Sequence, residues 1–371
     1  MESRSYQYIN VFKNKLMFLL KNISVYLSFL TLAITQIYDF SDIPSEDESF
    51  TTANFRIFIP EDIDTIRGIY AYMHGFGGDS RSVVQDSIMK ELSASIDFAL
   101  LGVQLDNMHM DSGIGNSLLD AKLEFANQSN HPELIYSPLF FDGYSWGGQW
   151  SYHYSQWKPE DVIAFVTMKG GYHDTTYSQN AINVPGYMFI GEYDSDYRIE
   201  NLTDIFLKHR LSGALWTLAM EPNSGHNRVS DRDLLNSFLF DMIDKRLPEV
   251  FNINEPILLN PLTENNGYLG NRTTFEIFNH NCYNFDRDSL SWMSNIENAQ
   301  KWQSFVSENS SNLVVDFCYL GDIDYDNYLT VLDILLILDI IIEGEYSTYA
   351  DINYNQAINI QDILMLLQLI L

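Results

Sequence analysis

The chain has 371 residues, a formal net charge of −29 and 46% apolar residues. This composition excludes an intrinsically disordered chain and leaves room for one large hydrophobic core with smaller units beside it. The negative charge disfavours nucleic-acid binding and contact with anionic membranes, because phosphate groups would be repelled. It suits solubility and cation binding and identifies no substrate.

The N-terminal segment has the parts of an export signal. Basic residues precede the apolar run Ile23–Ile34, and an acidic stretch follows from residue 39 to residue 48. This order predicts a signal peptide cleaved near Thr35, with translation starting at Met1 or Met17. An uncleaved membrane anchor is the alternative, but the run is shorter than the ~20 apolar residues that a span needs. We therefore expect a secreted or cell-surface protein with no stable membrane span, in which residues 1–45 are signal peptide and acidic linker.

Strand and helix patterns alternate between residues 54 and 248. Short apolar runs predict strands at 55–59, 69–73, 98–105, 139–142, 163–168, 187–190 and 214–220. Amphipathic segments predict helices at 81–96, 117–127, 149–157, 200–211 and 231–245. Such alternation predicts an α/β fold, with a mostly parallel sheet covered by helices on both faces, as a catalytic domain over residues 46–248.

A candidate nucleophile lies at Ser145. The segment Gly143–Gly148 matches the pattern G-x-S-x-G, follows the strand predicted at 139–142 and precedes a predicted helix. A serine on a sharp strand-to-helix turn exposes its hydroxyl above the sheet edge, and the flanking glycines allow the turn without a clash at Cβ. The helix that follows directs its positive N-terminal end at developing negative charge. The pattern therefore predicts a nucleophilic serine.

A candidate oxyanion hole follows the strand predicted at 69–73. The segment 74–78 reads His-Gly-Phe-Gly-Gly and lies upstream of the serine. A tetrahedral intermediate needs two N–H donors, one from the residue after the nucleophile and one from this earlier loop. We therefore expect the backbone N–H groups of Trp146 and Phe76 to form the oxyanion hole.

The general base and its acid are expected on loops after two later strands. Asp194 follows the strand at 187–190, and His226 follows the strand at 214–220. The chain order Ser, Asp, His is that of the hydrolase triad, in which the histidine takes the serine proton and the carboxylate orients the imidazole. Asp196 and Glu192 are alternative acids.

The connection between the strands at 163–168 and 187–190 is too short for a large lid. An open cleft is therefore expected, which would admit a bulky or polymeric substrate. Four aromatic residues fall on loops expected near this cleft, where they would stack on an aromatic or apolar acyl group. They are Phe76, Trp146, Tyr172 and Tyr193.

Residues 54–248 resemble an α/β-hydrolase, and within that superfamily the secreted esterases grouped with polyhydroxybutyrate depolymerases and feruloyl esterases. The resemblance rests on residues 74–78 and 143–148 together with Asp194 and His226. It implies a serine esterase that cleaves carboxylic esters with no cofactor in catalysis. Peptidases share the same parts, so a serine peptidase of this fold stays open, as does a non-catalytic docking protein on a hydrolase scaffold.

Residues 249–320 are rich in asparagine and weakly periodic. They are expected to form a linker or a small accessory module, with one helix over 296–306. Cys282 and Cys318, the two cysteines of the chain, either pair in an oxidising compartment or stay as thiols.

The last segment, 321–371, has nine acidic residues, no Lys or Arg, and an internal repeat. Oxygen donors recur at positions 1, 3, 5 and 12 of two loops, a spacing that wraps a hard cation. The expected calcium ligands, with backbone carbonyls at Tyr328 and Ala357, are Asp322, Asp324, Asp326, Tyr328 and Asp333 in loop one and Asp351, Asn353, Asn355, Ala357 and Asp362 in loop two.

This repeat resembles a dockerin domain, a small all-α unit in which each calcium loop ends in Asp and is followed by one helix. The resemblance implies docking to a cohesin-like partner on a scaffold or cell surface. Position 6 departs from the usual glycine, because it is Asn327 in loop one and Gln356 in loop two. Loop two also has only two carboxylates, so it is expected to bind calcium more weakly.

Overall fold

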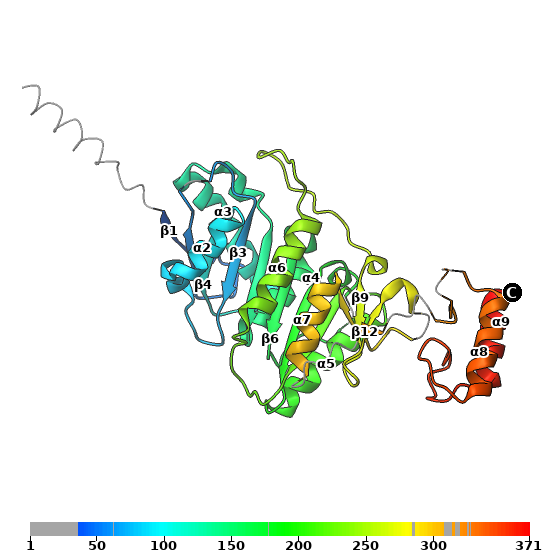
Figure 1. Cartoon of the computed structure of the whole chain (residues 1–371). Coiled ribbons are helices and arrows are strands. Elements are labelled where there is room, and N and C mark those ends of the chain that lie inside the picture. The colour runs from blue at the N-terminus through cyan, green and yellow to red at the C-terminus, as the bar shows by residue number, and fades with distance from the viewer. Residues whose placement is uncertain are drawn as a thin grey trace, which may run out of the picture.

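The computed structural model describes residues 36–371, except 62, 177, 284–285, 308–313, 316–319, 325 and 327 (Figure 1). The predicted signal peptide before residue 36 lies outside the described residues. Within the described ranges, no helix is long and apolar enough to cross a membrane.

The centre of the molecule is an eight-stranded sheet in the order β1-β2-β4-β3-β5-β6-β7-β8. Its strand β2 runs antiparallel to both neighbours, and all pairs from β4 to β8 are parallel. The strands are β1 Ile37–Asp42, β2 Ala53–Phe58, β3 Gly68–Met73, β4 Phe98–Leu105, β5 Leu139–Tyr144, β6 Val162–Met168, β7 Gly186–Gly191 and β8 Trp216–Glu221. This mostly parallel sheet, with a serine turn after β5, has the architecture of the α/β-hydrolase fold.

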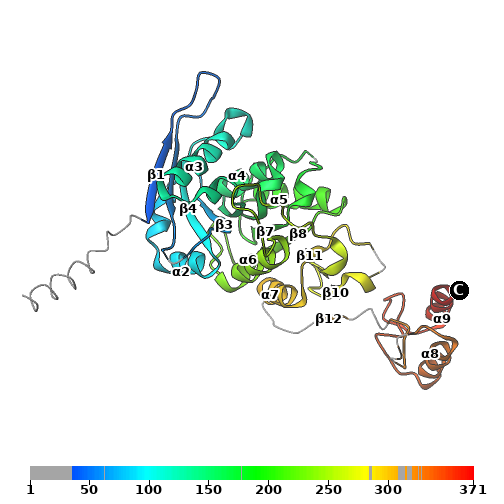
Figure 2. The ribbon, with the colours of Figure 1, turned by 90° about the horizontal axis from the view of Figure 1, so that it is seen from above.

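Helices cover both faces of this sheet, as the sequence predicts (Figure 2). One face packs against α3 Ile114–Ser129, α4 Trp146–Trp157 and α5 Asp196–Arg210. The other packs against α2 Ser87–Ser95, α6 Arg232–Arg246 and α7 Ile296–Val306. Because both faces are covered, the inner strands are mostly buried, and every residue of β6 and β7 is buried.

The predicted boundary of the catalytic domain at residue 46 is wrong, because the acidic stretch before it forms the edge strand β1. Tyr38 and Phe40 alternate with acidic and polar residues and pair with Ile57 and Phe55 of β2. The rings of Phe40 and Phe55 stack with centroids 6.3 Å apart. The strand alternation was present in the sequence but was obscured by the surrounding charge.

The predicted helix over 81–96 is two elements. The turn η1 Arg81–Gln85 ends before Asp86, whose side chain accepts the N–H groups of Ile88 and Met89 and so caps α2. A side-chain cap satisfies free N–H groups at the start of a helix, so the chain restarts there. Val83, before this break, and Met89, after it, both line the hollow beside the loop after β3.

Residues 249–320 are not a linker, because their described part packs on the helices and strands of the large sheet. A second sheet in the order β11-β9-β10-β12 is formed by β9 Tyr268–Gly270, β10 Ile277–Asn279, β11 Ser291–Met293 and β12 Val314–Val315. The helix α7 has the predicted bounds, and its Trp302 is fully buried with Nε1 donating to the Leu218 carbonyl at 3.1 Å. The side chain of Cys282 and the whole of Cys318 lie outside the described residues, so their pairing stays a prediction.

The C-terminal segment has a small core of its own. Helices α8 Val331–Glu343 and α9 Ile360–Ile370 pack through Ile337, Ala350, Ile352 and Leu366. Each helix begins with a capping box, in which the residue three positions into the helix bonds back to the cap. The duplication seen in sequence is therefore repeated in backbone structure.

Removal of residues 36–45 is expected to lower the melting temperature. Loss of β1 exposes Phe55 and Ile57, both of which are fully buried. Cross-strand pairs contribute about 0.2–1 kcal/mol each, so the six pairs of β1 and β2 amount to about 1–6 kcal/mol, which is several degrees in melting temperature. Thermal unfolding of chains starting at residues 36 and 46 measures this. Equal melting temperatures would show that β1 adds nothing to the fold.

Candidate active site

The predicted nucleophile lies on a strained turn between β5 and α4. Ser145 has φ 53° and ψ −119°, a conformation that non-glycine residues rarely adopt. The turn is held by a 2.6 Å hydrogen bond from the Ser145 N–H to the carbonyl of Met168, at the end of β6. A Cβ at Gly147 would lie 2.5 Å from the carbonyl oxygen of His74, so only glycine fits there. The G-x-S-x-G spacing therefore has a steric cause in this chain.

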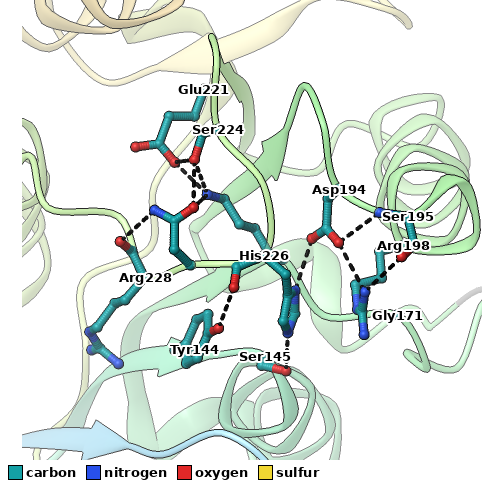
Figure 3. A network of polar contacts seen from close by, with 12 residues as sticks. Tyr144, Ser145, Gly171, Asp194, Ser195, Arg198, Glu221, Ser224, His226 and Arg228 are labelled. Atoms are coloured by element: carbon teal, nitrogen blue, oxygen red, sulfur yellow. Dashed lines mark hydrogen bonds and ion pairs between the residues drawn. The ribbon is translucent and has the colours of Figure 1, made fainter.

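Ser145, His226 and Asp194 form a continuous hydrogen-bonded chain (Figure 3). The Ser145 Oγ lies 3.0 Å from His226 Nε2, and His226 Nδ1 lies 2.9 Å from Asp194 Oδ2. A carboxylate accepts only, so Nδ1 carries the proton and Nε2 is free to accept from the serine hydroxyl. This arrangement can remove the serine proton as the hydroxyl attacks a carbonyl.

The two alternative acids, Glu192 and Asp196, are not the residues that bond to His226 in the described chain. Glu192 accepts the backbone N–H of Asn223 at 2.7 Å, and Asp196 is the first residue of α5. Among the described carboxylates, Asp194 is the one in contact with His226. The structure therefore brings together the three residues that the sequence favoured.

Asp194 is held as a carboxylate by its surroundings. Its Oδ1 accepts the backbone N–H of Ser195 at 2.7 Å and the guanidinium of Arg198 at 2.9 Å. Burial alone would raise the pKa of Asp194, but the hydrogen bonds from His226, Ser195 and Arg198 lower that pKa below its usual value. Arg198, in the first turn of α5, was not identified from the sequence, since its spacing from the acid has no catalytic signature.

The predicted oxyanion donors lie at the start of α4 and in the loop after β3. Trp146 is the first helical residue, so its N–H has no acceptor within the helix. Within the described chain, neither Trp146 N–H nor Phe76 N–H donates to a protein acceptor. The two loops are in close contact, because a Cβ at Gly75 would lie 3.7 Å from the Ser145 Cβ.

His74 anchors the oxyanion loop as a neutral ring. Its Nε2 accepts the Leu105 N–H at 3.1 Å, and its Nδ1 donates to the Gly75 carbonyl at 2.6 Å. Burial lowers the pKa of His74, which keeps the ring uncharged. The ring stacks on that of Trp146 with centroids 5.5 Å apart. The Trp146 side chain is therefore buried against His74, and the prediction that it stacks on substrate in the cleft is wrong.

Tyr144 was missed by sequence reasoning, although it is the variable residue before the serine. Its hydroxyl donates to the His226 carbonyl at 3.0 Å, and its ring lies 5.4 Å from the imidazole. These contacts hold the histidine loop over the nucleophile. The sequence carries no signal for this role, because it depends on a pairing 82 residues apart.

The other three predicted cleft aromatics are open to solvent. Phe76, Tyr172 and Tyr193 are 85%, 66% and 67% exposed. The Tyr172 ring lies 5.5 Å from that of Tyr197, and the Tyr193 hydroxyl donates to Asn223 at 3.2 Å. A hollow of about 680 Å³ opens beside the oxyanion loop, with walls that include Tyr72, His74, Val83, Met89, Tyr144 and Arg228.

A separate group of carboxylates fits a metal ion. Carboxylate oxygens of Asp322, Asp324 and Asp333 lie within 4.8 Å of one another, which is close enough for all three to coordinate one metal ion. Asp322 and Asp333 are buried. Buried like charges at this separation repel unless a cation lies between them, and oxygen donors suit calcium.

The two predicted calcium loops have the same backbone hydrogen bonds. The N–H of Asp326 donates to Asp322 at 3.1 Å, and the N–H of Asn355 donates to Asp351 at 3.1 Å. The last carboxylates also accept in the same way, from the Ile323 N–H to Asp333 at 2.8 Å and from the Asn353 N–H to Asp362 at 3.2 Å. At position 5, Asp326 accepts the Tyr328 N–H and Asn355 accepts the Ala357 N–H, both at 2.8 Å. Gln356 has φ 63°, which explains why glycine is usual at position 6.

No family model matches the chain, and no curated protein matches it. Its fold is similar to an acetyl xylan esterase from Aspergillus awamori, with 13% identity over 53% of this chain and 98% of that chain and a TM-score of 0.41. A ferulic acid esterase is 12% identical over 52% of this chain and 91% of that chain, with a TM-score of 0.38. The fluorophosphonate-binding serine hydrolase F of Staphylococcus aureus is 11% identical over 56% of this chain and 98% of that chain, with a TM-score of 0.39. Similarities this low carry no inference about what this chain acts on.

Arg198→Gln is expected to destabilise the protein at neutral pH and less so in acid. The depressed pKa of Asp194 means that its ionised form adds stability above its unfolded pKa of about 3.9, and this stability is lost as the pH falls through the lower folded value. Loss of one charged hydrogen bond costs about 1 kcal/mol at pH 7. Denaturant unfolding of both proteins at pH 7 and near pH 3 measures the difference. A difference that does not shrink in acid would contradict this account of Arg198.

Proposed function

We propose that this chain is a serine carboxylic ester hydrolase with Ser145, His226 and Asp194 as its catalytic triad. The hydrogen-bonded chain that starts at a strained serine carries the proposal. Strained backbone of this kind persists where the surrounding structure forces it and is concentrated at functional sites. A scaffold protein without activity would have no need to keep this geometry.

The reaction follows from the geometry. Ser145 Oγ attacks the ester carbonyl carbon while His226 Nε2 takes the hydroxyl proton, and the new oxyanion accepts the N–H groups of Trp146 and Phe76. The imidazolium then protonates the leaving alcohol as the carbon–oxygen bond breaks, which leaves an acyl-enzyme. Water, deprotonated by His226, attacks the acyl carbon and releases the acid and Ser145. No metal or cofactor is required for these steps.

We place the substrates among bulky, aromatic or polymeric esters. The β6–β7 connection contains only the short turn η5 Ala181–Asn183 among its described residues, so no helical lid covers the serine from that side. The exposed rings of Phe76, Tyr172 and Tyr193 would stack on apolar or aromatic groups. A peptide amide is the alternative substrate, to be distinguished by assay.

We further propose that the C-terminal segment is a dockerin-like unit that binds calcium and docks to a cohesin-like partner on a scaffold or cell surface. The clustered carboxylates and the repeated loops support calcium binding. Both helices also carry exposed large apolar side chains, which suit a protein partner. They are Val331, Leu332, Leu335, Leu338 and Ile342 of α8 and Ile360, Leu364, Leu367 and Leu369 of α9. Export by the N-terminal signal would bring the enzyme to such a partner.

Ser145→Ala is expected to abolish ester hydrolysis. The wild-type chain should cleave 4-nitrophenyl acetate, methyl ferulate or a polyester film, and the variant should lose about 10⁴-fold or more in kcat, because no group replaces the nucleophile. A fluorophosphonate probe should label only the wild type. Ser129→Ala, at the C-terminal end of α3, is the matched control and should keep full activity. A wild type that cleaves only a peptide amide would favour the peptidase, and equal rates in wild type and S145A would exclude the triad.

Asp333→Asn is expected to remove the tighter of two calcium-binding events. Loop one offers four carboxylates and loop two offers two, so calorimetric titration of the calcium-free chain should give two affinities. Asp362→Asn should remove only the weaker event. Chelation should destabilise α8 and α9 and leave ester hydrolysis unchanged, because the catalytic residues use no metal. Absence of heat on calcium addition to the wild type would contradict this assignment.

A further inference from the structure

Lys169 is a buried cation in contact with the loop that carries His226. It follows β6, is fully buried, and has φ 57°, which is uncommon for a residue with a side chain. Its N–H donates to the Phe189 carbonyl of β7 at 2.8 Å, and the preceding Met168 carbonyl accepts the Ser145 N–H. Lysine is almost never fully buried unless it is paired. The backbone of this lysine is thus fixed to the strand end that holds the nucleophile.

The side chain of Lys169 reaches the loop that carries His226. Its Nζ donates to Glu221 Oε2 at 2.5 Å, to Ser224 Oγ at 2.6 Å and to Asn227 Oδ1 at 3.4 Å. An ammonium has three protons, and each has an acceptor here. All three acceptors lie between the end of β8 and the residue after His226. Figure 3 shows Glu221 and Ser224 joined to this network beside the histidine loop.

The acid loop is joined to the same network. The Tyr193 N–H donates to the Ser224 carbonyl at 2.8 Å, next to Asp194 in sequence. A Cβ at Gly191 would lie 2.6 Å from the Ser224 carbonyl oxygen and 3.2 Å from Lys169 Cε, so the two loops and the lysine stem are in tight contact. Movement of the histidine loop would therefore disturb the acid loop as well.

We propose that Lys169 is a positioning residue that sets the distance between Ser145 Oγ and His226 Nε2. The inference rests on the proposed function, because the geometry it fixes is that of the triad. Lys169 connects the end of β6, which holds the serine backbone, to both sides of the histidine. The ion pair with Glu221 is largely removed from water, where removal of one partner leaves the other charge uncompensated. A displacement of about 1 Å between reacting groups is enough to slow an enzyme ~100-fold.

The test separates positioning from folding. Lys169→Met removes the charge and leaves the Glu221 carboxylate unpaired, so both stability and rate should fall. Adding Glu221→Gln to that variant removes the unpaired charge and should recover the melting temperature. If Lys169 positions the histidine, kcat on 4-nitrophenyl acetate stays about 10- to 100-fold low in the double variant, with KM changed by less than about 3-fold. The rate of fluorophosphonate labelling should fall in parallel.

Lys122→Met is the matched control. Lys122 is also buried, lies 3.9 Å from Asp161, and is on α3 away from the triad. Its replacement should leave kcat unchanged. If the wild type hydrolyses the ester and S145A does not, but the double variant recovers kcat together with stability, Lys169 is only structural and the proposal is wrong. If the wild type neither hydrolyses esters nor reacts with the probe, the proposed function fails and the positioning role fails with it.

Discussion

The site depends on one short backbone hydrogen bond, from the Ser145 N–H to the Met168 carbonyl. It holds a residue with a side chain at positive φ, where the free energy of the backbone is about 1–3 kcal/mol above that of ordinary conformations. The strained turn directs Oγ toward His226 and leaves the first N–H of α4 unbonded. The proposed nucleophile and the proposed oxyanion donor therefore arise from the same backbone conformation, which also leaves no room for a Cβ at Gly143 or Gly147.

The triad is supported electrostatically from two sides by different means. Asp194 is surrounded by donors, which keep it ionised and fixed in orientation. The histidine loop is held by two contacts: Lys169 Nζ donates to Ser224 Oγ, and the Tyr144 hydroxyl donates to the His226 carbonyl. Among the described residues, the ring of His226 has hydrogen bonds to Ser145 and Asp194, so the proton can move along this chain while the His226 backbone is fixed by Tyr144.

The sequence predicted the parts of this site whose cause is local. The serine turn, the glycine loop and the acid and base after successive strands each follow from neighbouring residues. Arg198, Tyr144 and Lys169 were missed because their partners are set by tertiary packing. Strand β1 was missed for a different reason, since acidic residues at its exposed positions resemble a linker. The side chain of Trp146 was wrongly assigned to the cleft, since it packs on His74, and its role as a backbone donor stays a prediction.

The segment after residue 248 has a physical role that composition could not indicate. Strand β8 carries the histidine loop and lies at the edge of the large sheet, where its outward N–H and carbonyl groups would lack partners. Ser291 Oγ accepts the Leu218 N–H at 3.0 Å and donates to the Leu218 carbonyl at 2.9 Å, and Trp302 donates to the same carbonyl. Thr217 bonds to the Trp292 carbonyl. Buried backbone groups must be paired, and the accessory module supplies these partners for β8. It therefore completes the sheet edge that precedes the His226 loop.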